Sequence, residues 1–247
     1  GMGLNSPFFQ LLAQGTGPEE AKRVAREHGQ ELFPAGNLRA SLRLSAGIWK
    51  TWFLVGIYFT TFGGFIALTA WLPTYWKSFF AVGAVTAGTL TALYSVLASV
   101  VRVAGGVISD RLGGERTAIL ALSTMFVGAA LMAGSERFAL SVVAEILLAL
   151  GMGVGNAAVF KLVPQEVPQA VGGAAGWVGG LGAFGGFAIP PVMGLFVRWF
   201  DRQGYATGFM VFVTLAAVAL GLAWTLKRAR ARRLATEAAL AAQGKAA

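Results

Sequence analysis

The sequence predicts an all-α membrane protein built of six transmembrane helices. Of its 247 residues, 56% are hydrophobic and only 13% are charged, whereas soluble domains carry roughly a quarter charged residues. Six apolar stretches are each long enough to supply the roughly 20 residues that cross a bilayer. Because every backbone polar group in lipid must be bonded within its own segment, we expect these stretches to be helices.

The first three spans are bounded by charges. The first, WFLVGIYFTTFGGFIALTAWL, lies between Lys50 and Lys77. The second runs from about 82 to 109 and contains one charge, Arg102. The third lies between Arg116 and Glu136. Each has the length of a membrane-crossing helix.

The last three spans follow the same pattern. The fourth lies between Arg137 and Lys161 and contains Glu145. The fifth contains the stretch GGAAGWVGGLGAFGGFAIPP and ends before Arg198, and the sixth, YATGFMVFVTLAAVALGLAWTL, ends at Lys227. We therefore expect a six-helix bundle over residues 48–227. A polar leader with a short amphipathic helix, PEEAKRVAREHGQELF, occupies 1–47, and a basic tail occupies 228–247.

The basic residues predict the orientation of the bundle. The net charge of +9 is concentrated in clusters that flank apolar runs, which is typical of a membrane surface rather than of nucleic-acid binding. If both termini are cytoplasmic, fifteen Lys and Arg residues lie inside and four outside. Positive residues favour the cytoplasmic side. We expect a multi-pass protein of the cell (inner) membrane with both termini in the cytoplasm.

Two charged side chains lie inside expected spans. Arg102 is eight residues before Asp110, which places it about 12 Å inside that helix end. It either faces a cavity, where its planar fork can grip an oxyanion by two hydrogen bonds, or extends back to the interface. Glu145 has three interpretations. A structural ion pair is favoured over proton coupling or contact with outside water.

Glycine and amide groups also lie within the spans. Gly151, Gly153 and Gly155 precede Asn156, whose buried amide either contacts a substrate or bonds a neighbouring backbone. The fifth span contains a literal GxGxxG at Gly180, Gly182 and Gly185. A dinucleotide site needs a strand before that motif, so we interpret the glycines as a smooth face for close helix packing or sliding.

Chemistry-bearing motifs are sparse. The chain has no cysteine, and its spans hold no HExxH, no GxSxG and no paired acids or histidines. The single histidine, His28, lies in the leader and is interpreted as a solvated side chain. We expect no enzyme activity, no cofactor and no metal site.

Four stretches resemble one transporter family. GGVISDRLGGER resembles the charge motif between helices 8 and 9 of the major facilitator superfamily, with Glu115 as a slight departure. GIYFTTFGGFIALTAWLP, GNAAVFKLVP and GWVGGLGAFGGFAIPP resemble helices 7, 10 and 11 of its nitrate/nitrite porters. From about residue 48 to 227, the chain resembles the C-terminal half of those porters, which is one half-bundle of the major facilitator fold.

The resemblance implies roles for individual residues. It implies that Arg102 clamps the anion, that Tyr58 and Phe62 line the substrate site, and that Asn156 lies near it. The corresponding structural interpretation of the two aromatic residues is core packing. The implied glycine signature is Gly176, Gly179, Gly180, Gly182, Gly185 and Gly186, and the implied gating charge motif is Gly106, Asp110, Arg111, Gly113 and Arg116.

The implied function is nitrate and nitrite transport by alternating access, as exchange or coupled to protons, with Glu145 as the candidate for coupling. Members of the family have twelve spans, with a second arginine and a second glycine signature that this sequence does not contain. We therefore expect an N-terminal half-transporter chain or a second copy as partner, together with the lipid bilayer and the two anions. The alternative is a non-transporting scaffold or sensor, or a split-gene remnant with the same half fold.

Overall fold

The computed structural model describes residues 11, 14–17, 20–21, 23–24 and 38–244. The chain divides into two units, residues 1–37 and residues 38–247. Most of the leader helix expected at 18–33, including His28, lies outside the described residues. The second unit contains all of the expected spans.

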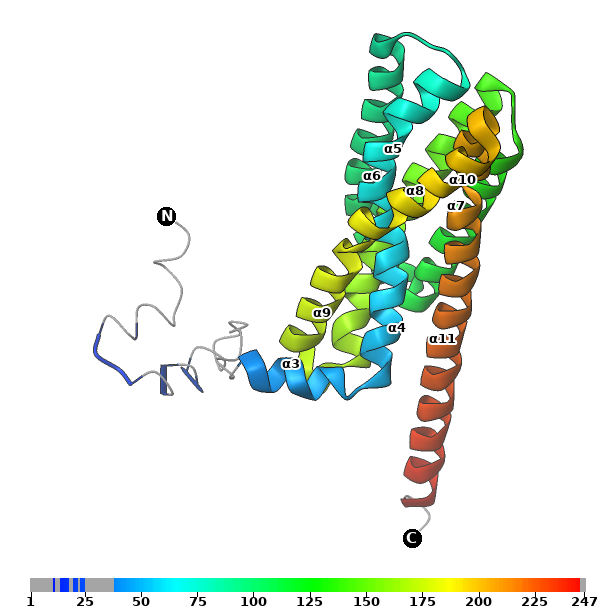
Figure 1. Ribbon diagram of the computed structural model, residues 1–247. Coiled ribbons are helices and arrows are strands. Elements are labelled where there is room, and N and C mark those ends of the chain that lie inside the picture. Colours follow the sequence, from blue (N-terminus) through cyan, green and yellow to red (C-terminus); the bar gives the residue numbers. More distant parts are fainter. Residues whose placement is uncertain (1–10, 12–13, 18–19, 22, 25–37, 245–247) are drawn as a thin grey trace. The chain divides into compact units, whose positions relative to one another are not determined.

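Six helices in the described part of the chain are long and apolar enough to cross a membrane, which confirms the predicted fold class (Figure 1). They cover Trp49–Phe79, Ala84–Leu112, Gly114–Gly134, Phe138–Glu166, Pro168–Thr207 and Met210–Thr236. The protein is therefore a multi-pass membrane protein. The second, third and fourth spans are each a single helix. They are α6 (Ala84–Leu112), α7 (Gly114–Gly134) and α8 (Phe138–Glu166).

The first span changes helical type in its middle. It consists of α4 (Trp49–Tyr58), the π-helical turn η1 (Phe59–Gly63) and α5 (Gly64–Phe79). A Cβ built at Gly63 would lie 2.6 Å from both the carbonyl oxygen of Gly182 and the Cα of Gly185. Glycine at position 63 therefore lets the fifth span cross the first at backbone contact distance. Single π-helical turns inside α-helices are frequent at functional sites.

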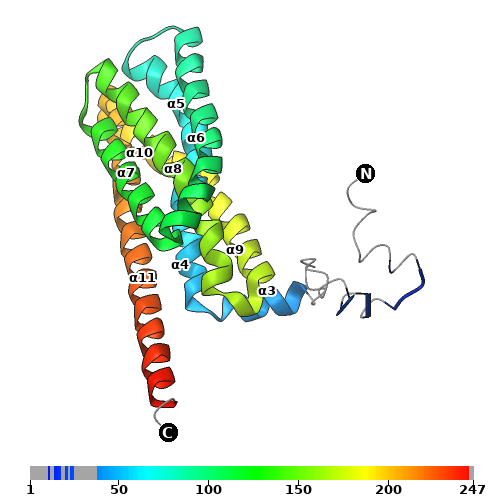
Figure 2. The ribbon, with the colours of Figure 1, turned by 180° about the vertical axis from the view of Figure 1, so that it is seen from behind.

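The central helix of the bundle is α8, which packs against α4, α6 and α7. Glycines permit two of these contacts, because a Cβ at Gly151 would lie 2.7 Å from the carbonyl oxygen of Ala121 on α7, and one at Gly105 would lie 2.8 Å from the Cα of Val154 on α8. Figure 2 shows α7 and α8 running side by side. The small residues thus serve close helix approach, as they do in membrane interfaces.

The fifth span is not one uninterrupted helix. The 3-10 turn η2 (Pro168–Ala170) leads into α9 (Val171–Ala183), and Phe184 separates α9 from α10 (Gly185–Thr207). Within α10 the backbone leaves the helical region at Asp201, whose φ is 46°. A Cβ at Gly185 would lie 2.7 Å from the carbonyl oxygen of Phe59, so the break at Phe184 coincides with the crossing at η1.

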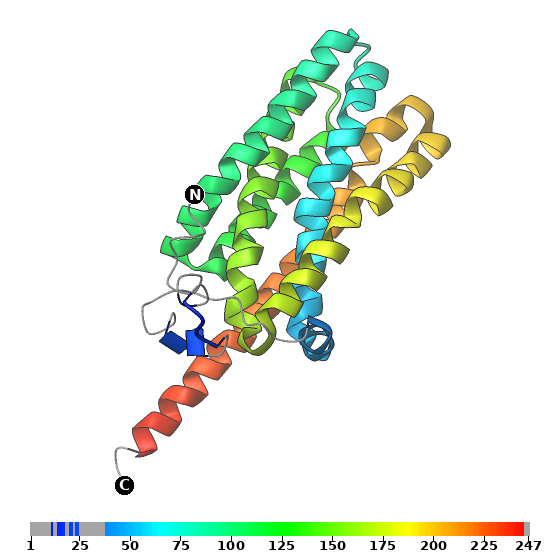
Figure 3. The ribbon, with the colours of Figure 1, turned by 90° about the vertical axis from the view of Figure 1, so that its left-hand side faces the viewer.

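Helices also occur at both ends of the predicted bundle. Helix α3 (Leu38–Ala46), within the stretch expected to be leader, packs against α9. The Ser41 hydroxyl accepts a hydrogen bond from the Gly173 N–H at 2.9 Å, and the Trp177 indole donates to the carbonyl oxygen of Leu42 at 3.0 Å. The last helix, α11 (Met210–Gly244), continues into the stretch expected to be tail and extends past its neighbours (Figure 3).

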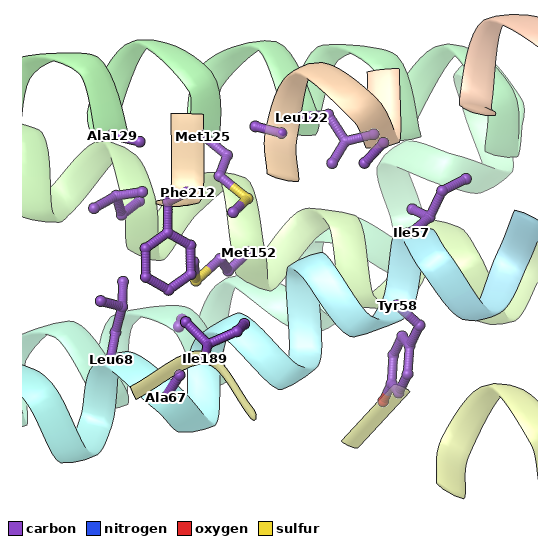
Figure 4. Packing of buried hydrophobic residues seen from close by; sticks show 14 of the residues in the cluster. Ile57, Tyr58, Ala67, Leu68, Leu122, Met125, Ala129, Met152, Ile189 and Phe212 are labelled. Atoms are coloured by element: carbon purple, nitrogen blue, oxygen red, sulfur yellow. The ribbon is translucent and has the colours of Figure 1, made fainter. Parts of the chain in front are cut away.

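The core is built from long apolar side chains that meet between α5, α7, α8 and α11. Figure 4 shows the labelled side chains that fill this space, namely Leu68, Met125, Met152 and Phe212. Tyr58 extends from α4 away from this group, toward the fifth span (Figure 4). The bundle therefore has an apolar packing centre and, displaced from it, a region with polar and aromatic groups.

Candidate functional site

Arg102 lies near the middle of α6 and is half-buried. Its guanidinium carbon is 5.0 Å from the centre of the Phe62 ring. Among residues 38–236 its buried Nε has no hydrogen-bond partner, and Arg102 makes no ion pair. The side chain is thus held against an aromatic face, and its Nε is not bonded by an oxygen of these residues.

Phe62 and Tyr58 form an aromatic pair beside this guanidinium. Their rings are stacked with centroids 5.0 Å apart and planes 19° apart. The edge of Tyr58 meets Phe160 of α8 at 5.1 Å. Tyr58 and Phe62 are four residues apart and therefore lie on the same side of the span, where their rings stack. The first span thereby places two aromatic faces next to Arg102.

Asn156 lies on α8 with only 2% of its surface exposed, and neither its amide nitrogen nor its oxygen has a hydrogen-bond partner in the described part of the chain. Residues four apart share a helix face. One turn before it, Met152 accepts a hydrogen bond from the Tyr94 hydroxyl, and one turn after it, Phe160 contacts Tyr58. Asn156 therefore lies on the same face of α8 as Met152 and Phe160.

Sequence reasoning missed several members of this region. Phe160 lies four residues after Asn156 and therefore on the same helix face. This spacing could have indicated Phe160 from the sequence. Phe65 continues the aromatic row, with its centroid 6.2 Å from Phe62 and 5.8 Å from Tyr94. The hydroxyl of Thr61 is buried without a partner, but a threonine in an apolar helix gives no sequence signal of its own.

The glycine signature divides into two groups. Cβ atoms at Gly182, Gly185 and Gly186 would lie within 2.7 Å of Tyr58, Phe59 and Ile66 respectively, so these three positions pack against the first span. A Cβ at Gly179 or Gly180 would meet nothing within 4 Å. At Gly176 the nearest atom, on Leu42, would be 3.3 Å away. The glycine-rich span therefore packs on one side and is open on another.

The predicted charge motif forms a tight corner between α6 and α7. Gly113 alone separates the two helices, with a φ of 86° that suits glycine. Asp110 accepts a hydrogen bond from Lys161 of α8. A Cβ at Gly106 would meet no atom within 4 Å. Arg111 and Arg116 are exposed.

Two further ion pairs secure the same end of the bundle. Glu115, the departure from the family motif, accepts a hydrogen bond from Arg230 of α11, which also donates to the side-chain oxygen of Gln165 at 3.0 Å. Lys50 of α4 pairs with the buried Glu166. Together with Asp110 and Lys161, these contacts tie the last turn of α8 to α4, α6 and α11.

The structural ion pair expected for Glu145 is not present among residues 38–236. The side chain is buried, and neither carboxylate oxygen has a hydrogen-bond partner there. The expectation was wrong because the position of an acid along its own helix does not show which side chains the neighbouring helices bring to it. No group of three His, Cys, Asp or Glu residues that could hold a metal ion occurs among the described residues.

Comparisons with known proteins complete the description of the site. Residues 7–190 and 54–246 match the model of the Major Facilitator Superfamily. The chain is 33% identical to the probable nitrate/nitrite antiporter NarK1 of Thermus thermophilus, over 68% of this chain and 42% of that protein. It is 33% identical to the nitrite extrusion protein of Bacillus subtilis strain 168, over 67% of this chain and 41% of that protein.

A third relative gives the same picture. The chain is 34% identical to the probable nitrate/nitrite transporter NarK2 of Mycobacterium tuberculosis strain H37Rv, over 72% of this chain and 45% of that protein. The chain thus spans less than half the length of each of these three relatives.

Proposed function

Because the chain belongs to the major facilitator superfamily, we propose that it is one half of a nitrate/nitrite transporter that works by alternating access. The names of its relatives support these substrates. The observation that carries the proposal is Arg102, which lies in mid-span against Phe62 without an ion-pair partner. A half-buried arginine in mid-span is costly unless an anion or water offsets its charge.

The proposed binding mode follows from the shape of the ion. Nitrate is planar, and a guanidinium can donate two parallel hydrogen bonds to two of its oxygens. The faces of Phe62 and Tyr58 cover the plane of the anion, and the Asn156 amide supplies a further donor. These groups replace part of the water that the anion loses on entering the membrane.

Transport requires the site to open to each side of the membrane in turn. In alternating access, two bundles rock around a site near the bilayer midplane. This chain supplies one bundle, and we propose that a second, from an N-terminal half-transporter chain or from another copy, completes the site. The open positions Gly179 and Gly180 support this assignment, since they leave backbone uncovered on one side of α9.

The proposed location is the cell (inner) membrane, with both termini in the cytoplasm. In that orientation the ion pairs of Lys50, Asp110 and Glu115 lie at the cytoplasmic ends of the helices, where they hold this half-bundle together. The activity is transport rather than catalysis, and the anion leaves chemically unchanged.

The test is reconstitution in nitrite-loaded vesicles. The chain is combined with the portion of the Thermus relative that it does not match, and nitrate uptake is measured beside the chain alone. We expect uptake only from the combination. Robust uptake by the chain as a proven monomer would contradict the need for a second half. Nitrate binding without flux from the combination would favour the scaffold or sensor alternative.

A further inference from the structure

Helix α8 carries two buried acids with opposite surroundings. Glu166 is paired with Lys50, so its negative charge is compensated. Glu145 is 1% exposed, and neither of its oxygens has a hydrogen-bond partner among the described residues. An ionised carboxylate is costly in such a place, whereas a protonated carboxyl carries no charge to compensate.

The described side chains that interact with Glu145 carry no positive charge. They are Tyr75 and Trp76 of α5 and Tyr94 of α6. The Tyr75 hydroxyl donates to Ser141 at 3.2 Å and the Tyr94 hydroxyl to the sulfur of Met152 at 2.9 Å, so both phenol protons are directed elsewhere. The Trp76 indole N–H lies near enough to the carboxyl to interact with it, but among the described residues it makes no hydrogen bond of normal geometry.

The third neighbouring helix adds no titratable group at this level. A Cβ at Gly128 of α7 would lie 2.9 Å from the carbonyl oxygen of Ala144 and 3.0 Å from the backbone nitrogen of Leu148. Helix α7 therefore approaches this part of α8 through backbone. Because the two helices are this close, position 128 has no room for any side chain, basic or otherwise.

An aromatic cluster separates Glu145 from the nearer end of the bundle. Trp76 contacts Phe80 at 5.4 Å and Phe138 at 5.3 Å, and Phe80 and Phe138 contact each other at 5.5 Å. Phe80 follows α5 and Phe138 begins α8, so the cluster covers that end of both helices. Glu145 itself is 1% exposed, so its carboxyl is enclosed in the structure described.

A continuous row of rings joins the acid to the anion site. Tyr94, which faces Glu145, stacks with Phe65 at 5.8 Å, and Phe65 stacks with Phe62 at 6.2 Å. Phe62 carries the guanidinium of Arg102 on its face. Contiguous packed side chains of this kind can transmit a rearrangement from one site to another.

We propose that Glu145 is the proton-binding site of this transporter half and that its protonation accompanies anion movement. The inference rests on the proposed function and decides between exchange and proton coupling. In the conformation described, the carboxyl holds one proton and is enclosed by the aromatic cluster. When the rings separate, the proton passes to water, and the resulting carboxylate stays hydrated until it binds another. One proton and one nitrate then cross together without net charge.

The protonation state can be tested on this chain alone. The infrared carbonyl band of a protonated carboxylic acid is recorded for the chain in lipid vesicles at neutral pH, in H₂O and in D₂O. We expect the band in the wild type, its loss in Glu145→Gln, and its retention in Glu136→Gln, which alters an exposed acid. A wild type without the band, or a band that persists in Glu145→Gln, would overturn the proposal.

Coupling is tested in the completed transporter. An inside-alkaline gradient is imposed on vesicles, and for one proton per nitrate we expect about tenfold nitrate accumulation per pH unit. Glu145→Gln should lose this accumulation and retain nitrate/nitrite counterflow, and Glu136→Gln should retain both. If the wild type shows nitrate/nitrite counterflow but its nitrate accumulation does not depend on the pH gradient, the coupling is overturned and the proposed function stands. Absence of both fluxes in the wild type would overturn both.

Discussion

At the scale of single residues, Arg102 differs from the arginines that hold the bundle together. Arg202 donates to the carbonyl oxygen of Phe79 from two nitrogens, at 3.0 and 2.7 Å, and Arg230 bonds Glu115 and Gln165. Those two side chains have their donors occupied by protein oxygens. Arg102 rests on Phe62 with its buried Nε unbonded, so its donors are available to an anion from solution.

The fork of Arg102 gives the first prediction. Arg102→Lys keeps the charge but loses the second parallel hydrogen bond, and one bond to a charged group is worth about 2 kcal/mol. We expect nitrate uptake by the completed transporter to fall by roughly 30-fold. Arg198→Lys, at an exposed arginine, serves as the matched control. Near-normal uptake by Arg102→Lys would show that the bidentate geometry is not used.

Asn156 gives a prediction about stability and binding together. Its buried amide has no partner, and a buried polar group left unpaired costs roughly 1–3 kcal/mol. Asn156→Leu should therefore leave the thermal unfolding midpoint of the solubilised chain unchanged or raise it, while nitrate affinity of the completed transporter falls. Ser141→Ala, which removes the acceptor of the Tyr75 hydroxyl, should lower the midpoint. A lower midpoint in Asn156→Leu would indicate a structural role instead.

The sequence predicted part of this site and could not predict the rest. Family resemblance implied Arg102, Tyr58, Phe62 and Asn156. The structure joins the first three through the contacts of Phe62, and Asn156 lies one helical turn before Phe160, which contacts Tyr58. The binding roles of these four residues remain predictions. The surroundings of Glu145 were out of reach, because an acid on one helix says nothing about the side chains that two other helices bring to it.

At the scale of elements, hydropathy predicted the six spans because crossing a bilayer fixes the length of an apolar helix. It could not predict where the first and fifth spans change geometry. The π-helical turn at 59–63 and the break at Phe184 occur where Gly63 meets Gly182 and Gly185 at backbone distance. Such a crossing depends on two segments far apart in the sequence.

The two groups of signature glycines give the third prediction. In Gly185→Ala the new methyl would meet the carbonyl oxygen of Phe59 and the Cα of Gly63, and overpacking against backbone costs about 1–3 kcal/mol. Gly180→Ala meets nothing within 4 Å, and alanine favours a helix over glycine by about 1 kcal/mol. Thermal unfolding of the chain should show a lowered midpoint for the first variant only. Equal midpoints would contradict the division into packed and open glycines.

At the scale of the whole molecule, one end of the bundle is held by ion pairs while one side of it is left open. The last turn of α8 is bonded through Lys161, Gln165 and Glu166 to three other helices. The glycine-rich helix α9 instead leaves Gly179 and Gly180 uncovered. A bundle secured within itself and open along one side of α9 is consistent with the proposal that it is one of two rigid bodies that rock against each other.

The absence of cysteine allows the open side to be mapped directly. We expect a single cysteine in Gly180→Cys to react with a maleimide when the chain is alone and to be protected, by about tenfold in rate, when the second half is present, because a packed neighbour excludes the reagent. A cysteine in Leu120→Cys, at an exposed position of α7, should react equally in both cases. Protection at Leu120, with none at Gly180, would place the second half against α7 and remove the structural reason for assigning the open glycines to the transport interface.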